Sequence, residues 1–164
     1  MKLAINDDGE IDYDVLSKLP YLDAVISETL RKYPPVQRLE RTSTQSYQIP
    51  NTSIVINKGD VVYVPVYAIH HDEEYYPDPE KFIPERFLPE NRHKIKPFTY
   101  LPFGSGPRNC IGMRFGLLEA KLALAKIITK YKFVKSANTQ VPLEFLPFRG
   151  ILTPKSIIVG IQHR

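Results

Sequence analysis

The sequence has one cysteine, no tryptophan and no long uninterrupted run of apolar residues among its 164 positions. A single thiol, that of Cys110, excludes an internal disulfide and a cysteine-rich zinc site. A bilayer-spanning helix needs about 20 apolar residues in succession, so none is predicted within the sequence. Cys110 is therefore an inert thiol, a ligand or a nucleophile.

Glycine is also scarce beside proline, with 8 glycines against 15 prolines. This proline share is about twice the average, so the chain is expected to turn often and rigidly. The 43% hydrophobic, 11% aromatic and 24% charged residues exclude a collagen, a disordered polar tail and a coiled coil. Length and composition together predict one globular domain.

Charges of the two signs are distributed unevenly along the chain. Residues 1–90 carry 9 basic and 16 acidic side chains, whereas residues 91–164 carry 13 basic and 2 acidic ones. A basic second part is typical of a face that docks an acidic protein, a nucleic acid or an anionic membrane, and an ordinary solvated surface explains it equally well. The bases form no clustered stripe on an identifiable recognition element, so we expect no nucleic-acid partner.

The first part of the chain predicts a helix followed by strands. Apolar residues recur at helical spacing from Pro20 to Tyr33, where a Pro-Pro pair ends the pattern. The residues from 70 to 102 are acidic, aromatic and rich in proline, which predicts an ordered meander with short helical turns. Between these segments, alternating stretches predict a small antiparallel sheet over residues 45–49, 53–56 and 61–67.

A second long helix is expected from just after Cys110 to about Tyr131. It is apolar on nearly every side, which predicts burial among several other elements. The tail predicts a turn over residues 147–154 and then a strand over residues 156–161. Helices and strands are segregated rather than interleaved, so the predicted fold class is mixed α and β.

Residues 103–112 read Phe-Gly-Ser-Gly-Pro-Arg-Asn-Cys-Ile-Gly and are the most informative stretch. Two glycines and a proline predict a tight loop whose backbone another group can approach closely. Cys110 is expected where the second helix begins, and there the helix dipole and Arg108 would favour a thiolate. An isolated buried cysteine is usually structural, but this loop favours a functional thiol.

The loop resembles the haem-binding loop of the cytochrome P450 superfamily, Phe-x-x-Gly-x-Arg-x-Cys-x-Gly, at every specified position. The resemblance implies that Cys110 is the axial ligand of the iron of haem, which is iron protoporphyrin IX. It also implies that Phe103 packs beside the sulfur and that Arg108 pairs with a haem propionate. Gly106 and Gly112 would let the loop and the helix pass close to the porphyrin.

Two further motifs occur in the family's order. Glu28-Thr29-Leu30-Arg31 resembles the family's Glu-x-x-Arg, and Pro84-Glu85-Arg86-Phe87 resembles its later meander motif. The resemblance implies a buried triad of Glu28, Arg31 and Arg86, covered by the meander. Taken alone, Glu and Arg three residues apart on a helix are usually a weak surface pair, and both lie away from the apolar stripe. Periodicity therefore predicts that they are exposed.

Weaker assignments follow from the same resemblance. Arg41 is placed as a second propionate-binding arginine, and residues 35–39 and 150–152 are placed in the substrate pocket, although core packing explains the second segment equally well. His70 and His71 precede three acidic residues, which superficially indicates a metal cluster. Adjacent residues do not share a face, so we expect no metal there, and the two histidines fit a family segment that precedes the meander.

The resemblance extends from about residue 12 to the C-terminus and is best to insect or animal microsomal members. It implies the C-terminal, proximal part of a mainly α fold: helix K, a small β sheet, the meander, the cysteine loop, helix L and a terminal β hairpin. Residues 1–164 would then form a single partial domain that lacks the N-terminal membrane anchor and helices A to J. Because helix I supplies the proton-delivering residues, we expect no catalytic residue of that kind in this sequence.

The implied function is a monooxygenase that inserts one atom of dioxygen into a small apolar substrate. Its electrons would come from NADPH through a reductase, at the cytoplasmic face of the endoplasmic reticulum membrane, with membrane contact through the missing anchor or peripheral residues. Arg114 and Lys121 would help to dock the acidic electron donor, although ordinary surface solvation explains them equally well. The alternative is a truncated, non-catalytic chain that at most binds haem.

Overall fold

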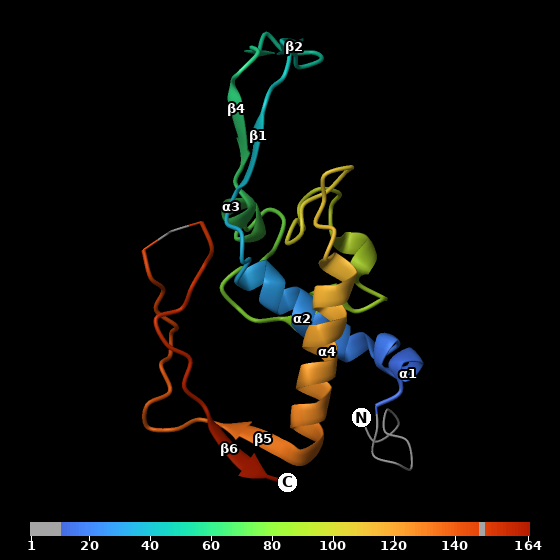
Figure 1. The fold of residues 1–164 in the computed structure, drawn as a ribbon, viewed down its shortest axis with the longest axis vertical. Helices are drawn as coiled ribbons and strands as arrows, with labels where there is room; N and C mark the ends of the chain where they lie inside the picture. The colour runs from blue at the N-terminus through green and yellow to red at the C-terminus, as the bar shows by residue number, and fades with distance from the viewer. Residues whose placement is uncertain (1–10, 148–149) are drawn as a thin grey trace.

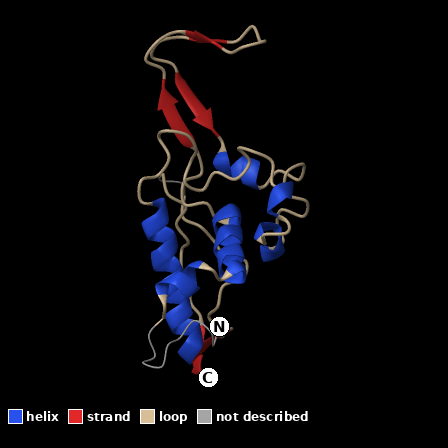
Figure 2. Cartoon of the chain, turned by 90° about the vertical axis from the view of Figure 1, so that its right-hand side faces the viewer, coloured by secondary structure: helices blue, strands red, loops and turns tan. Residues whose placement is uncertain are grey.

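The computed structural model describes residues 11–147 and 150–164, and two helices form its centre. Helix α2 (Pro20–Lys32) crosses α4 (Met113–Lys130), and a long hairpin projects beyond them at one end (Figure 1). Seen from the side, the helices gather in the lower part of the molecule, away from the hairpin (Figure 2). The fold class is mixed α and β, as predicted.

Helix α2 confirms the sequence prediction to within one residue. Pro20 occupies its first turn, where its missing N–H group costs no hydrogen bond, and Tyr33 ends it ahead of the Pro-Pro pair. A short helix that was not predicted, α1 (Tyr13–Ser17), precedes it. The carboxylate of Asp12 caps α1 by accepting hydrogen bonds from the N–H groups of Asp14 and Val15, at 2.7 and 3.2 Å.

Two clusters of buried apolar residues hold these elements together. The first joins Leu16 of α1, Leu22 and Ile26 of α2, and Ala125 of α4. The second lies on another side of α2, where Ala24 packs with Tyr76 and Phe87 of the meander. Helix α2 is therefore covered by α4 on one side and by the meander on the other.

The strands between residues 39 and 64 form two separate antiparallel ladders, so the prediction of one small sheet is corrected. Strand β1 (Leu39–Thr42) pairs with β4 (Val61–Val64), and at the tip β2 (Tyr47–Gln48) pairs with β3 (Val55–Ile56). The predicted strand 61–67 ends early because Pro65 precedes a helix, α3 (Val66–His70). Strand β1 was not predicted, because its Leu-Glu-Arg-Thr sequence shows no clear alternation and most of it is exposed.

The segment between α3 and the cysteine loop is an ordered meander with short helical turns, as predicted. It contains the 3-10 helices η2 (Pro84–Phe87) and η3 (Arg92–Lys94), and η2 packs closely against α2. The prolines restrict longer helices there. The meander thus supplies the second cover of α2.

Helix α4 ends one residue before the predicted position, but its predicted burial is wrong. Ala125 is its one fully buried residue, because α1 and α2 cover only part of its surface. After α4, β5 (Tyr131–Val134) pairs with β6 (Gly160–His163). The predicted strand 156–161 therefore begins too early, and the predicted turn 147–154 lies partly outside the described residues. No helix in residues 11–147 and 150–164 is long and apolar enough to cross a membrane.

Candidate functional site

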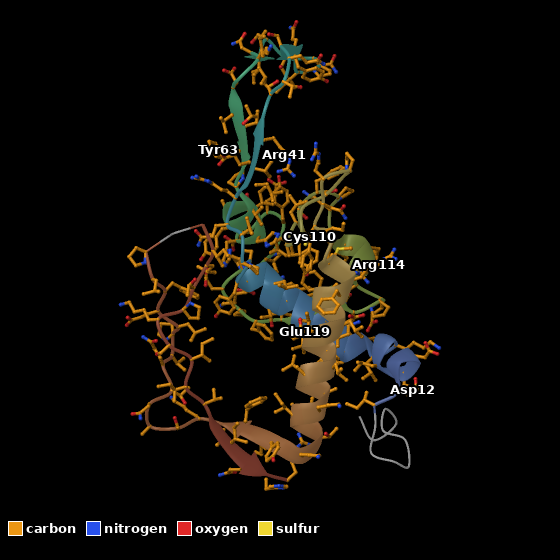
Figure 3. All side chains as sticks on the ribbon, in the orientation of Figure 1. Asp12, Arg41, Tyr63, Cys110, Arg114 and Glu119 are labelled. Carbon is orange, nitrogen blue, oxygen red and sulfur yellow. The ribbon has the colours of Figure 1, made fainter. Side chains whose placement is uncertain are left out.

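The loop from Phe103 to Gly112 turns tightly and presents Cys110 at the end of α4. Gly104 and Gly106 adopt φ angles of +74° and +79°, which side chains rarely tolerate. The Cys110 N–H group donates to the Phe103 carbonyl at 2.9 Å, and this bond closes the loop. The thiol is exposed and lies where the loop meets the helix (Figure 3). Cys110 precedes the first helical residue by three positions, close to where it was predicted.

Open space surrounds the loop where the resemblance predicts close approach. A β-carbon at Gly106 would have no atom within 4 Å outside its chain neighbours, so this part of the backbone is uncovered. A β-carbon at Gly112 would lie 3.9 Å from Cys110 Sγ, so glycine there leaves the side of the sulfur free. Both positions fit the close approach of a flat group.

Two arginines from distant parts of the chain meet at this loop. Arg41 of β1 donates from Nη2 to the carbonyl oxygen of Arg108 at 3.2 Å. Neither arginine forms an ion pair with a carboxylate among the residues that the structure describes. The structure therefore brings the two predicted propionate-binding arginines together and leaves their charges available to an anionic ligand.

Apolar surface adjoins the thiol and the arginines. Ile111 and Phe115 are exposed next to Cys110, with Phe115 70% exposed, whereas Phe103 is half-buried. A depression lies between the β1–β4 ladder and the cysteine loop. It is lined by Leu39, Val64, Phe98, Leu101, Ser105 and Gly106. The site thus combines one thiol, two cations and an apolar wall.

Glu28 and Arg31 form a buried ion pair on α2. Both side chains are 0% exposed, and the guanidinium donates from Nε to Glu28 Oε2 at 2.8 Å and from Nη2 to Oε1 at 2.9 Å. Arg31 also donates to the carbonyl oxygens of His70, Pro79 and Lys81. The meander covers this face of α2, so the pair is buried and the exposure expected from periodicity is wrong.

Arg86 of η2 completes the predicted triad. Its Nε lies 3.7 Å from Glu28 Oε1. This Nε is buried and has no hydrogen-bond partner within the described part of the chain. Burial lowers the pKa of Arg86, and the charge of Glu28 opposes that shift. Glu28 Oε1 also accepts a hydrogen bond from the Ile83 N–H at 2.9 Å. The Glu28 carboxylate therefore contacts both Ile83, just before η2, and Arg86 within it, and so holds α2 against η2.

His70 has a structural role that the sequence analysis missed. Its side chain is fully buried, and its Nε2 accepts a hydrogen bond from the Leu101 N–H at 2.8 Å. Nδ1 lies 3.1 Å from the Arg31 carbonyl oxygen, so Nδ1 carries the proton and donates it. Burial lowers the pKa of His70 to about 4, which keeps the ring neutral. Both ring nitrogens thus form hydrogen bonds with backbone atoms, and no sequence pattern indicated either bond.

The two segments predicted to contact substrate lie side by side. Val36 and Ile151 form an antiparallel bridge, and the Leu152 N–H donates to the Pro35 carbonyl at 2.8 Å. The side chains of Val36 and Ile151 are exposed. Core packing therefore does not account for these apolar residues in the described chain.

The two bases predicted to dock an electron donor differ in their surroundings. Lys121 is 12% exposed, and its Nζ lies 2.5 Å from Asp23 Oδ1 of α2. Its charge is therefore used within the chain. Arg114 is exposed and lies in the first turn of α4, near Cys110 (Figure 3).

Comparison with known proteins identifies a single family. A family model described as Cytochrome P450 matches residues 1–160. The chain is 52% identical over 151 residues to "Probable cytochrome P450 6a14" of Drosophila melanogaster, covering 92% of this chain and 30% of that protein. It is 48% identical over 147 residues to "Cytochrome P450 3A2" of Rattus norvegicus, covering 90% of this chain and 29% of that protein. The chain thus spans about 30% of the length of these curated relatives.

Proposed function

The chain belongs to the cytochrome P450 family, and on that premise we propose that it forms the cysteine-side wall of a haem-thiolate monooxygenase. Cytochromes P450 are haem proteins in which a cysteine thiolate holds the iron. The observation that carries the proposal is the exposed Cys110 thiol beside two arginines that have no carboxylate partner in the described residues. In this proposal α2 is helix K, residues 70–102 are the meander and α4 is helix L.

The donor set fits haem in each of its chemical parts. Cys110 would supply the axial thiolate, and Phe103 would pack beside its sulfur. Arg41 and Arg108 would pair with the two propionates, since guanidinium groups bind carboxylates strongly and with directed hydrogen bonds. The apolar depression beside Gly106, and the free side of the sulfur at Gly112, would accept the flat ring.

When bound, haem would activate dioxygen so that one oxygen atom enters an apolar substrate. The residues of this chain would hold the group and shape its surroundings. Glu28, Arg31 and Arg86 would keep the meander fixed against α2, because a buried ion pair is stable only when its partners are all present. The bridged segments that contain Val36 and Ile151 would contact the apolar substrate.

Electrons from NADPH would reach the site through a reductase at the cytoplasmic face of the endoplasmic reticulum membrane. Arg114 is the better of the two predicted bases for docking an acidic donor, because it is exposed near Cys110. Lys121 does not fit that role, since it already pairs with Asp23. The partner would therefore approach the end of α4 that carries the cysteine loop.

A second candidate is a non-catalytic chain that at most binds haem. It is favoured by the surface of α4, where Ala125 is the one fully buried residue and the apolar side chains of Phe115 and Ile127 are exposed. Exposed apolar area of this kind favours self-association over stable monomers. Both candidates share the haem site and differ in substrate turnover.

The test is the carbon-monoxide difference spectrum of the reduced chain after reconstitution with haem. We expect a Soret band of thiolate ligation in the wild type, and loss of that band in Cys110→Ser. Asn109→Ala is the matched control, because Asn109 is exposed in the same loop and has no proposed role. No band in the wild type, or a band unchanged in Cys110→Ser, would refute the haem assignment. Turnover of an apolar substrate then separates the two candidates.

A further inference from the structure

A continuous path of backbone hydrogen bonds leads from the His70 side chain to Cys110. His70 Nε2 accepts from the N–H of Leu101. The carbonyl of Leu101 accepts from the N–H of Gly104 at 3.1 Å, and the carbonyl of Phe103 accepts from the N–H of Cys110 at 2.9 Å. The imidazole therefore fixes the residue from which the cysteine loop departs.

The other ring nitrogen connects His70 to α2. Its Nδ1–H donates to the carbonyl of Arg31, and Arg31 Nη1 donates in return to the carbonyl of His70 at 2.8 Å. This reciprocal pair joins α3 to the arginine that Glu28 holds. One imidazole thus bridges the buried ion pair and the loop of the thiol.

Two tyrosines enclose the ring and restrict its motion. Tyr100 stacks on it with ring centres 5.6 Å apart, and Tyr76 meets it edge-on at 6.3 Å. Each tyrosine is anchored by its hydroxyl, Tyr76 to the Thr99 carbonyl at 3.0 Å and Tyr100 to the Ser27 carbonyl at 3.1 Å. The ring is held between α2 and the segment that enters the loop.

We infer that His70, as its Nδ1–H tautomer, is a positioning residue that sets where the loop presents the Cys110 thiol. This inference rests on the proposed haem function and adds a residue outside the loop to it. The role needs a donor toward Arg31 and an acceptor toward Leu101 on one rigid side chain, which neutral imidazole provides. Filling the buried volume alone would not satisfy the Leu101 N–H group.

Two amide variants of His70 distinguish positioning of the cysteine loop from mere filling of the buried volume. His70→Gln can place its amide oxygen near the position of Nε2 and so keep an acceptor for Leu101. His70→Asn is shorter and can replace only the donor toward Arg31. Their chemistry is otherwise alike, so a difference between them reports the Leu101 bond.

The measurement is the thiolate-ligated fraction in the reduced carbon-monoxide spectrum, at equal helix content by circular dichroism. We expect His70→Gln to keep most of the band and His70→Asn to lose at least threefold. His71→Gln is the matched control, because the Nδ1 of His71 bonds only within its own helix, to Tyr67. Equal thiolate fractions in the two His70 variants would overturn the inference.

A second readout needs no haem. In the wild-type chain labelled with ¹⁵N, we expect Nδ1 of His70 to be protonated and its Nε2 to show scalar coupling to the amide of Leu101, with both signals absent in His70→Asn. Coupling without a thiolate band in the wild type would support the tether and refute the haem assignment. A thiolate band together with an Nε2–H tautomer would refute the tether and leave the haem assignment standing.

Discussion

The buried carboxylate of Glu28 offers the sharpest test of the scaffold that supports the cysteine loop. It accepts two hydrogen bonds from Arg31 and one from the Ile83 N–H, and the guanidinium of Arg86 lies 3.7 Å away. Glu28→Gln keeps the shape of the side chain and removes its charge. Two guanidinium groups are then left facing a neutral amide whose NH₂ group points a donor at other donors.

Removing one partner of a buried ion pair costs about 3–5 kcal/mol, because the remaining charge has lost its compensation. For a chain of this size, each kcal/mol lowers Tm by roughly 2–4 °C, so we expect Glu28→Gln to melt about 6–20 °C below the wild type. Urea denaturation followed by circular dichroism gives the free energy of unfolding, and differential scanning fluorimetry gives Tm.

The control is Glu74→Gln, the same change at an ion pair whose members, Glu74 and Lys96, are both more than half exposed. Exposed pairs contribute little to stability, so this variant is expected to match the wild type. Adding Arg31→Met to Glu28→Gln removes one of the two uncompensated charges, and the double variant is expected to lose less than the sum of the two single losses. If Glu28→Gln is no less stable than Glu74→Gln, the ion pair does not support the fold.

Three further predictions concern the site and its surroundings. Arg41→Gln and Arg108→Gln are each expected to weaken haem binding about fivefold in a haem titration. That factor corresponds to roughly 1 kcal/mol, the loss of one solvent-exposed charged pair. Unchanged affinity would show that the arginine does not bind a propionate. His70 has a pKa of about 4 when folded and roughly 6.5 when unfolded, so its contribution is complete above about pH 6.5 and falls as the pH drops toward 4. Between pH 7 and pH 5 that loss is about 2 kcal/mol by urea denaturation, and His70→Gln is expected to flatten the dependence. Gly160→Ala would place a β-carbon 2.8 Å from Val134 Cγ2 of β5, and this crowding is expected to lower the free energy of unfolding by about 1–3 kcal/mol. Gly116→Ala would place a β-carbon on α4 with nothing within 4 Å, and it is expected to raise Tm because alanine favours helix more than glycine does.

Local signals explain which parts of the fold were predictable from the sequence. The start and end of α2 depend on Pro20 and on the Pro-Pro pair after Tyr33, and both act within a turn of the helix. The cysteine loop is equally local, since Gly104 and Gly106 take the positive φ angles that a tight turn needs. Strand β1 could not be predicted from local signals, because it pairs with β4, whose residues lie about 20 positions away in the chain.

Glu28 and Arg31 show the limit of periodicity on a helix. The pattern compares residues of α2 only with one another, and on that basis the pair belongs to the polar face. The cover comes from His70 and from residues 79–86, which lie about 40 to 55 positions later in the chain. The resemblance implied a buried triad because it relates α2 to the later meander motif, which periodicity within one helix cannot do.

Two exposed apolar regions remain, and their polar groups distinguish them. Close to Cys110 in the chain, Ile111 and Phe115 are exposed, and the Arg41 guanidinium donates to the carbonyl of Arg108 in the same loop as the thiol. Between α2 and α4, a groove is lined mostly by apolar residues, and the hydroxyl of Tyr21 is the one polar side-chain group among the described residues that line it. A small-molecule site needs a few directional polar groups to fix its ligand, whereas protein packing needs only complementary apolar shape. The region at Cys110 therefore fits a cofactor. The groove shows the limit of apolar character as a signal: it predicted that α4 is buried, but it does not identify which element would cover the helix.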